Sequence, residues 1–290
     1  MADITMENIK KLREVTGAGI MDCKKALAKA EGDFEKAQEI LRQKGAEKAE
    51  KKKDRATNSG LIETAIVGGS AAMVELCCET DFVAKNDIFK GLAKEFADMV
   101  VSSGDQEFTI ENLPDSIRAA QQSKLAEAIG KIGENMTFRR CVKISFGETG
   151  KVASYVHMGG KIGVLVELGT PSKEIADAAE TAELAKDIAM QIAAQYPRLV
   201  RREDFSDDEL AKQKKMIAEL AAEENPKKPA NIVERIANGK LEKFFQSACL
   251  VDQAFIKDPS KNVAQLVKEV SKKVGGEIVV KRFVRFSLGE

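Results

Sequence analysis

The sequence predicts an α+β protein in which short β-hairpins alternate with amphipathic helices. β-Prone runs flank glycine-rich turns at residues 61–78 and 152–168, which is a hairpin signal. Helical periodicity follows each hairpin. The segments 132–148 and 274–290 align without gaps and share Gly, Arg, Val, Ser, Gly and Glu at matching positions. This pattern indicates a duplicated core with antiparallel three-stranded sheets, and the alternative is chance similarity between two β-prone strands.

Residues 1–45 predict a module of three short helices. Each helix is expected to end at a glycine, near Gly17, Gly32 and Gly45, and Asp33 is placed to cap the third. Such a small bundle is only marginally stable alone. Residues 46–58, rich in Lys, Glu and Ala, predict a charged helical linker.

Residues 59–149 are expected to form the first half of the core. A strong apolar stripe that includes Ile88, Phe89, Leu92 and Phe96 indicates an amphipathic helix. A second helix is expected after Pro114, and a strand over 136–146 completes this half.

The second half of the core is expected to be formed by residues 150–203 and 240–290. It combines the second hairpin with a long helix over 173–195, helices over 241–250 and 263–274, and a strand over 278–288. Residues 204–239 interrupt it. Because Pro226 and Pro229 force a turn between two helical segments, we expect an inserted antiparallel helical hairpin.

Composition and charge limit the function. The 290 residues contain 46 Lys+Arg and 46 Asp+Glu, so the formal net charge is zero. A chain with balanced charge has no overall attraction to nucleic acids or anionic membranes, so we expect neither as a direct partner. The N-terminus lacks a signal-peptide pattern, and no run approaches the roughly 18–20 apolar residues of a membrane span. These features predict a cytoplasmic protein.

The sequence offers little catalytic chemistry. It contains no GxxxxGK[ST], GxGxxG or GxSxG motif, and His157 is its only histidine. The five cysteines form no CxxC pair and predict reduced thiols, with adjacent Cys77 and Cys78 on opposite faces of a strand. We therefore expect a binding protein with no catalytic residue, metal or cofactor. The enzymatic alternative is a cysteine enzyme that pairs Cys23, Cys77 or Cys78 with His157.

The segment Glu79–Asn86 lies between a predicted buried strand and the amphipathic helix. In one interpretation Asp81 begins a helix and Phe82 packs as a hydrophobic staple against the helix behind it. In the other, Phe82 is an aromatic wedge on a loop, offered to a partner. The residues alone leave both interpretations open.

Several motifs resemble the elongation factor Ts family, in the family's order along the chain. The N-terminal run from Leu12 to Leu27 matches it almost position by position, and Thr80-Asp-Phe-Val-Ala-Lys-Asn86 resembles its signature loop. Further similar segments are Ile132-Gly-Glu-Asn135, the run from His157 to Leu168, Asn238-Gly-Lys-Leu241 and Phe283-Val-Arg-Phe286.

The resemblance implies a module of ubiquitin-associated type, a two-subdomain core and an inserted hairpin that could support a homodimer through 204–239. It also implies a partner, elongation factor Tu, and an activity, the release of GDP from that partner. A helical adaptor that binds without nucleotide exchange is the alternative. The partner-binding residues implied by the family pattern are Thr80, Asp81, Phe82 and Val83 in the loop that disturbs the partner's Mg²⁺ site, with Arg13, Ile20, Met21 and His157 as further contacts.

One departure from the family pattern concerns the same region. Cys77 stands where the family commonly has asparagine. We expect this substitution to alter how the Thr80–Val83 loop is braced.

Overall fold

A computed structural model describes residues 5–104 and 106–290, so residues 1–4 of the predicted N-terminal module lie outside the described residues. The chain is α+β, as predicted. Contacts between residues divide the chain into two compact units. The first unit contains the chain up to Ser145 together with Met158–Ile162 and Phe286–Glu290, and the second contains Phe146–His157 and Gly163–Arg285.

The N-terminal helices of the first unit enclose a small core of their own. Helix α1 ends at Gly17, whose φ of 67° closes the helix in the left-handed conformation that glycine tolerates. Asp33 caps α3 by accepting from the Lys36 N–H, as predicted. The helices are α1 (Met6–Thr16), α2 (Ile20–Lys29) and α3 (Phe34–Glu50), and their core is Ile9, Leu12, Cys23, Ala26, Leu27, Ala30 and Ala37.

The predicted end of the third helix at Gly45 is wrong. Helix α3 runs through Gly45 to Glu50 and packs against α6 (Asp115–Ile132). A Cβ atom placed on Gly130 of α6 would lie 3.2 Å from the Gly45 Cα atom. Gly45 therefore permits a close helix crossing and does not end the helix, a role that local sequence signals cannot distinguish from a stop.

The sheet of the first unit has the strand order β1-β2-β4-β3, and its neighbouring strands are antiparallel. The two-residue strand β3 extends the three-stranded sheet that the sequence predicts. Residues Ala72, Val74, Leu76 and Cys78 of the central strand face the helices. The strands are β1 (Ser59–Val67), β2 (Ser70–Cys78), β3 (Phe108–Thr109) and β4 (Met136–Ser145).

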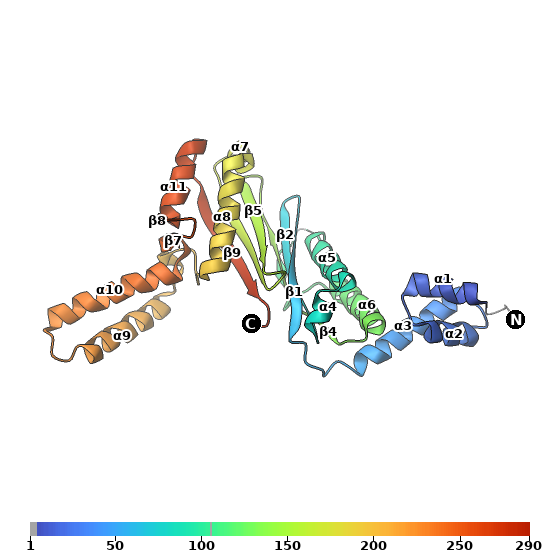
Figure 1. Ribbon diagram of the computed structural model, residues 1–290. Coiled ribbons are helices and arrows are strands. Elements are labelled where there is room, and N and C mark those ends of the chain that lie inside the picture. The colour runs from blue at the N-terminus through green and yellow to red at the C-terminus, as the bar shows by residue number, and fades with distance from the viewer. Residues whose placement is uncertain (1–4, 105) are drawn as a thin grey trace. The chain divides into compact units, whose positions relative to one another are not determined.

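Helices α5 (Asp87–Val101) and α6 cover one face of this sheet (Figure 1). The predicted apolar stripe of α5 is buried at Phe89, Leu92 and Phe96. Ile88 departs from the prediction, because its side chain is 57% exposed. It lies in the first turn, at the edge of the stripe, where the Asn86 side chain caps the helix by accepting from the Ile88 N–H.

The second unit repeats the pattern of hairpin, helices and strand. Its three-stranded sheet has the order β5-β6-β9, with α8 packed on β5 and α11 packed on α8. The predicted long helix over 173–195 is two helices, because Ala178 takes an extended conformation with ψ of 141°. The elements are β5 (Gly150–His157), β6 (Ile162–Gly169), α7 (Lys173–Asp177), α8 (Ala179–Gln195), β7 (Ala254–Phe255), β8 (Asp258–Asn262), α11 (Val263–Val274) and β9 (Val279–Ser287).

The inserted hairpin consists of α9 (Asp207–Glu224) and α10 (Ala230–Ala248), which lie side by side (Figure 1). Helix α10 passes through Gly239 without a break, so the second helix of the predicted insert and the helix predicted over 241–250 are one. An aromatic cluster of Phe205, Phe244 and Phe245 lies near its end. The short 3-10 helices are η1 (Arg202–Asp204) and η2 (Leu250–Asp252).

Equivalent ion pairs, each between a buried glutamate and a partly exposed arginine, support the duplication of the core. In the first unit, Glu75 on β2 is fully buried and accepts from the Arg140 Nε of β4 at 2.5 Å. In the second unit, Glu167 on β6 is buried and accepts from the Arg282 Nε of β9 at 2.7 Å. Arg140 and Arg282 coincide in the gapless sequence alignment. The same arginine paired with a buried glutamate in both sheets is not expected of two strands that are similar by chance. The division of the chain into five segments remains a prediction.

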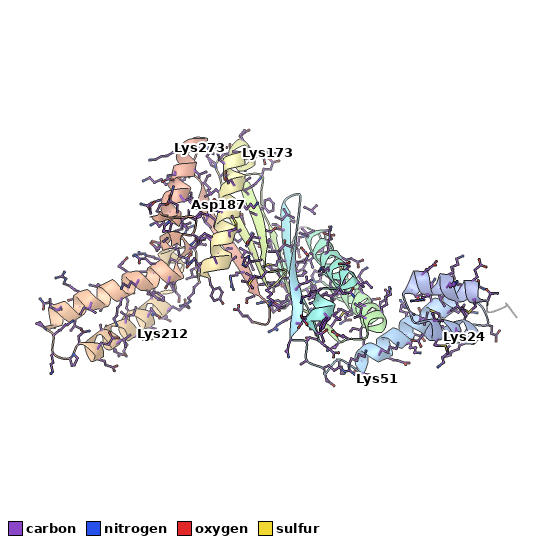
Figure 2. The ribbon with its side chains drawn as sticks, in the orientation of Figure 1. Lys24, Lys51, Lys173, Asp187, Lys212 and Lys273 are labelled. Carbon is purple, nitrogen blue, oxygen red and sulfur yellow. The ribbon has the colours of Figure 1, made fainter. Side chains whose placement is uncertain are left out.

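Positive charge is spread over many elements and is often paired locally. The lysines labelled in Figure 2 include Lys24 on α2, Lys212 on α9 and Lys273 on α11. Lys273 pairs with Glu180 at 3.3 Å. Among the described residues, no helix is both long and apolar enough to cross a membrane.

Candidate functional site

The candidate site is centred on residues Thr80–Val83, called the exchange loop here after the role that the family resemblance implies. The loop follows β2 and forms most of α4 (Asp81–Ala84), a helix of a single turn. Thr80 is its N-cap, with an extended backbone and a side-chain oxygen that accepts from the Val83 N–H at 3.4 Å. The β2 strand therefore leads into a short turn that presents the side chains of Asp81 and Phe82 outward.

Phe82 is the most exposed large apolar side chain among the described residues, with 82% of its surface accessible. This exposure rules out the staple interpretation, because a staple would be packed against the following helix. Asp81 does begin a helix, as that interpretation proposed. Val83 points the other way and packs, partly buried, against the core of the first unit.

Two glutamates brace the start of the exchange loop. Glu134 accepts two hydrogen bonds from Thr80, one from its N–H at 3.0 Å and one from its hydroxyl at 2.7 Å. Glu79 accepts from the Asn135 N–H at 2.6 Å. Asn135 is buried and its side chain donates to the carbonyl of Arg55 at 2.8 Å. The loop is thus tied to the segment between α6 and β4.

The predicted role of Cys77 in bracing has no counterpart in these contacts. Cys77 is buried, and its Sγ lies 3.6 Å from an oxygen of Glu75 on the same strand. The neighbouring Cys78 faces the helices instead, as the predicted opposite orientation requires. Cys78 is the cysteine that touches the loop, because its thiol donates to the Thr80 carbonyl at 3.2 Å.

The exposed turn also carries negative charge. Lys85 donates to Asp81 at 2.8 Å, and this hydrogen bond holds the pKa of Asp81 below its ordinary value. Asp81 is therefore ionised at neutral pH. An aromatic ring and a carboxylate project from adjacent positions, which suits an encounter with a surface that has both an apolar recess and cationic groups.

The N-terminal module contributes a second set of exposed side chains to the first unit. Ile20 and Met21 begin α2 and are 47% and 61% exposed. Arg13 lies exposed in the last turn of α1. Val15, 57% exposed, adds an apolar side chain that sequence reasoning did not select. Exposed Ile and Met on a small, well-packed bundle are typical of a protein-binding surface.

His157 belongs to the second unit and ends β5. Its side chain is exposed, and its Nδ1 lies 2.9 Å from the Tyr155 hydroxyl. The two rings are stacked with centroids 5.7 Å apart. The hydrogen bond and the stacking hold the imidazole in place while leaving it accessible.

The five thiols are poorly suited to nucleophilic catalysis. All are free and buried. Burial raises the pKa of Cys77 to about 11 and that of Cys78 to about 12. At neutral pH both therefore remain protonated, whereas a cysteine nucleophile reacts as the thiolate. Within the described part of the chain, no group of three or more His, Cys, Asp or Glu residues is arranged to hold a metal ion.

Sequence reasoning missed the supporting residues Glu79, Glu134 and Asn135. The motif that contains Glu134 and Asn135 resembles the family, but nothing in its sequence indicates a contact with Thr80. The partners are separated by 54 residues. Only the pairing of β2 with β4 brings them together.

Comparison with known proteins identifies the family. Residues 79–290 match the family described as Elongation factor TS. Elongation factor Ts of Clostridioides difficile is 44% identical over 294 aligned positions, which cover 100% of this chain and 94% of the relative. The proteins of the same name from Trichlorobacter lovleyi and Lawsonia intracellularis are 41% and 40% identical, and each alignment covers 99% of this chain. The alignments cover 93% and 99% of those relatives. The chain belongs to the elongation factor Ts family of translation elongation factors.

Proposed function

We propose that this protein binds elongation factor Tu in its GDP form and promotes the release of GDP during translation elongation in the cytoplasm. The observation that carries the proposal is the exposure of Phe82 on a braced one-turn helix. A large apolar side chain held in solvent costs free energy unless a partner covers it. In this proposal, the exchange loop enters the partner near its nucleotide and Mg²⁺ site.

Exchange of this kind is thermodynamic linkage. A protein that binds nucleotide-free elongation factor Tu more tightly than the GDP form must weaken GDP binding by the same factor. Each tenfold loss of nucleotide affinity requires roughly 1.4 kcal/mol of differential binding. Displacing Mg²⁺ is an effective route, because the ion neutralises much of the charge on the diphosphate.

Phe82 alone supplies only part of this free energy. Covering its side chain is worth about 1.5–3 kcal/mol, or roughly a tenfold to hundredfold effect. A larger effect needs a broad interface, to which we assign the exposed residues Arg13, Ile20 and Met21 of the N-terminal module and His157 of the second unit. Asp81 contributes its negative charge beside Phe82.

The decisive experiment measures GDP release directly. Elongation factor Tu is loaded with fluorescent GDP, an excess of unlabelled GDP is added, and the fluorescence decay is timed with and without this protein. We expect a substoichiometric amount to accelerate release of the whole bound pool. The protein alone should neither bind nor hydrolyse GTP. An unchanged release rate would refute the proposal.

The same assay separates the alternatives. A helical adaptor would form a complex with elongation factor Tu, visible by gel filtration, but would leave the GDP release rate unchanged. A cysteine enzyme would lose its activity on thiol alkylation under native conditions. The buried, protonated thiols of this chain argue against that alternative.

A further inference from the structure

We infer that Glu134 is the positioning residue of the exchange loop: it fixes Thr80 and thereby sets the direction in which Phe82 is presented to the partner. This inference rests on the proposed function. Glu134 is half-buried and hydrogen-bonds to Thr80, which lies two residues before Phe82 in the chain. It therefore acts through Thr80 and need not touch the partner.

The contact between Glu134 and Thr80 determines the orientation of the Thr80 side chain. The Glu134 carboxylate accepts both the Thr80 N–H, at 3.0 Å, and the Thr80 hydroxyl proton, at 2.7 Å. With its proton directed to Glu134, the hydroxyl oxygen is free to accept from the Val83 N–H at 3.4 Å. The carboxylate and the helix cap thus form one continuous chain of hydrogen bonds.

The position of Glu134 is itself fixed from both sides. The preceding Gly133 ends α6 in the left-handed conformation, with φ of 90°, and its carbonyl accepts from the Lys52 side chain. The following Asn135 is buried and held by three hydrogen bonds, one to Glu79 and two to the backbone of the linker after α3. Glu134 is therefore a rigid anchor, suited to fixing a neighbouring loop.

Helix α4 needs such an anchor because it is very short. Four residues form a single turn, which is not stable by itself in water. On the inner side, the turn is held by the half-buried Val83 and by the Cys78 thiol, which donates to the Thr80 carbonyl at 3.2 Å. Without the Glu134 carboxylate, the turn would still be attached to the core, but Phe82 would sample several orientations.

The test separates positioning of the loop from general stability. GDP release is measured against increasing concentrations of this protein, which gives a maximal rate and a half-saturating concentration. We expect Glu134→Ala to lower the maximal rate about tenfold, with a smaller change in the half-saturating concentration. Glu134→Gln keeps one acceptor and should fall between wild type and Glu134→Ala.

A second mutation shows whether Glu134 acts through the aromatic ring. In a Phe82→Ala background, Glu134→Ala should have little additional effect on the maximal rate, because there is no ring left to orient. If instead Glu134→Ala slows exchange by the same factor in both backgrounds, it acts elsewhere and the inference is overturned. If the Glu134→Ala protein does not fold, the same comparison is made with Glu134→Gln.

Alkylation of Cys78 provides a readout that is independent of the partner. This thiol is buried beneath Thr80, so it should react faster when the turn is loosened. Peptide mapping after mild alkylation should show faster labelling of Cys78 in Glu134→Ala, with Cys141 in the adjacent strand unchanged as an internal control. Equal labelling of Cys78 in both proteins would contradict the inference.

The failures of the inference and of the proposed function are distinguishable. If wild-type protein accelerates GDP release and Phe82→Ala slows it, but folded Glu134→Ala exchanges at the wild-type rate, only the role of Glu134 is refuted. If wild-type protein does not accelerate release at all, the proposed function itself is refuted.

Discussion

The pair Phe82 and Phe89 allows one prediction to be worked out in detail. The two phenylalanines are seven residues apart, yet Phe82 is 82% exposed and Phe89 is fully buried. Phe82→Ala removes a side chain that packs little in the free protein, so the free energy of unfolding should change by no more than about 0.5 kcal/mol. Phe89→Ala leaves a cavity in the core of the first unit and should cost about 3–5 kcal/mol.

The two substitutions should affect nucleotide exchange in the opposite order, with the larger loss for Phe82→Ala. Loss of the Phe82 ring removes about 1.5–3 kcal/mol of apolar burial in the complex, which predicts a tenfold to hundredfold slower stimulated GDP release. Phe89→Ala, assayed at a temperature where it remains folded, should exchange at close to the wild-type rate, because Phe89 is not accessible to a partner. Met216→Ala on α9, where Met216 is 55% exposed, is the control for removing an exposed apolar side chain.

The assay combines urea unfolding, followed by circular dichroism, with the fluorescent GDP release measurement. The reasoning would be refuted by a Phe82→Ala protein that exchanges at the wild-type rate. It would also be refuted by a lower urea midpoint for Phe82→Ala comparable to that of Phe89→Ala, since this would show that the ring is packed in the free protein.

Three further predictions concern other parts of the chain. His157→Ala should slow stimulated GDP release severalfold while leaving the melting temperature unchanged, since the ring is exposed; a drop of many degrees would indicate a structural role. Replacing residues 211–240 by a short Gly/Ser linker retains the aromatic cluster, and this variant should release GDP from the partner at a near-normal rate. Light scattering on the same variant reports whether the insert mediates a homodimer. Hydrogen bonds from Lys44 and Lys48 hold the pKa of Asp22 below its ordinary value, so their stabilisation is present above about pH 4 and is lost as the pH falls through the lower, folded-state pKa. Thermal unfolding of Asp22→Asn should therefore differ from wild type at pH 7, and the difference should shrink below pH 4.

Local signals predicted most of the secondary structure. Caps and turns have a short-range physical cause, and the elements they mark occur where expected, as at Gly17 and Asp33. The predictions failed where a glycine served packing. Gly45 is predicted to end the third helix, yet it lies inside α3, where it allows the close approach of Gly130. Conversely, the break between α7 and α8 at Ala178 is not marked by a glycine or a proline.

For the candidate site, the motifs alone indicate the family and select the residues to test. The motif around Phe82 resembles the family's signature loop, and its position between an apolar strand and an amphipathic helix limits it to two roles. The sequence could not choose between them, because a phenylalanine at a helix entry has the same local pattern whether it packs inward or projects outward.

Long-range packing distinguishes between those two roles. The exposure of Phe82 depends on the core beneath α4 being filled by other side chains, such as Val83 and Phe89. The bracing of Thr80 by Glu134 depends on a strand pairing that joins residues 54 positions apart. Both are properties of long-range packing, which no short window of sequence contains, whereas helix caps, turns and the family motif are fixed by residues that are neighbours along the chain.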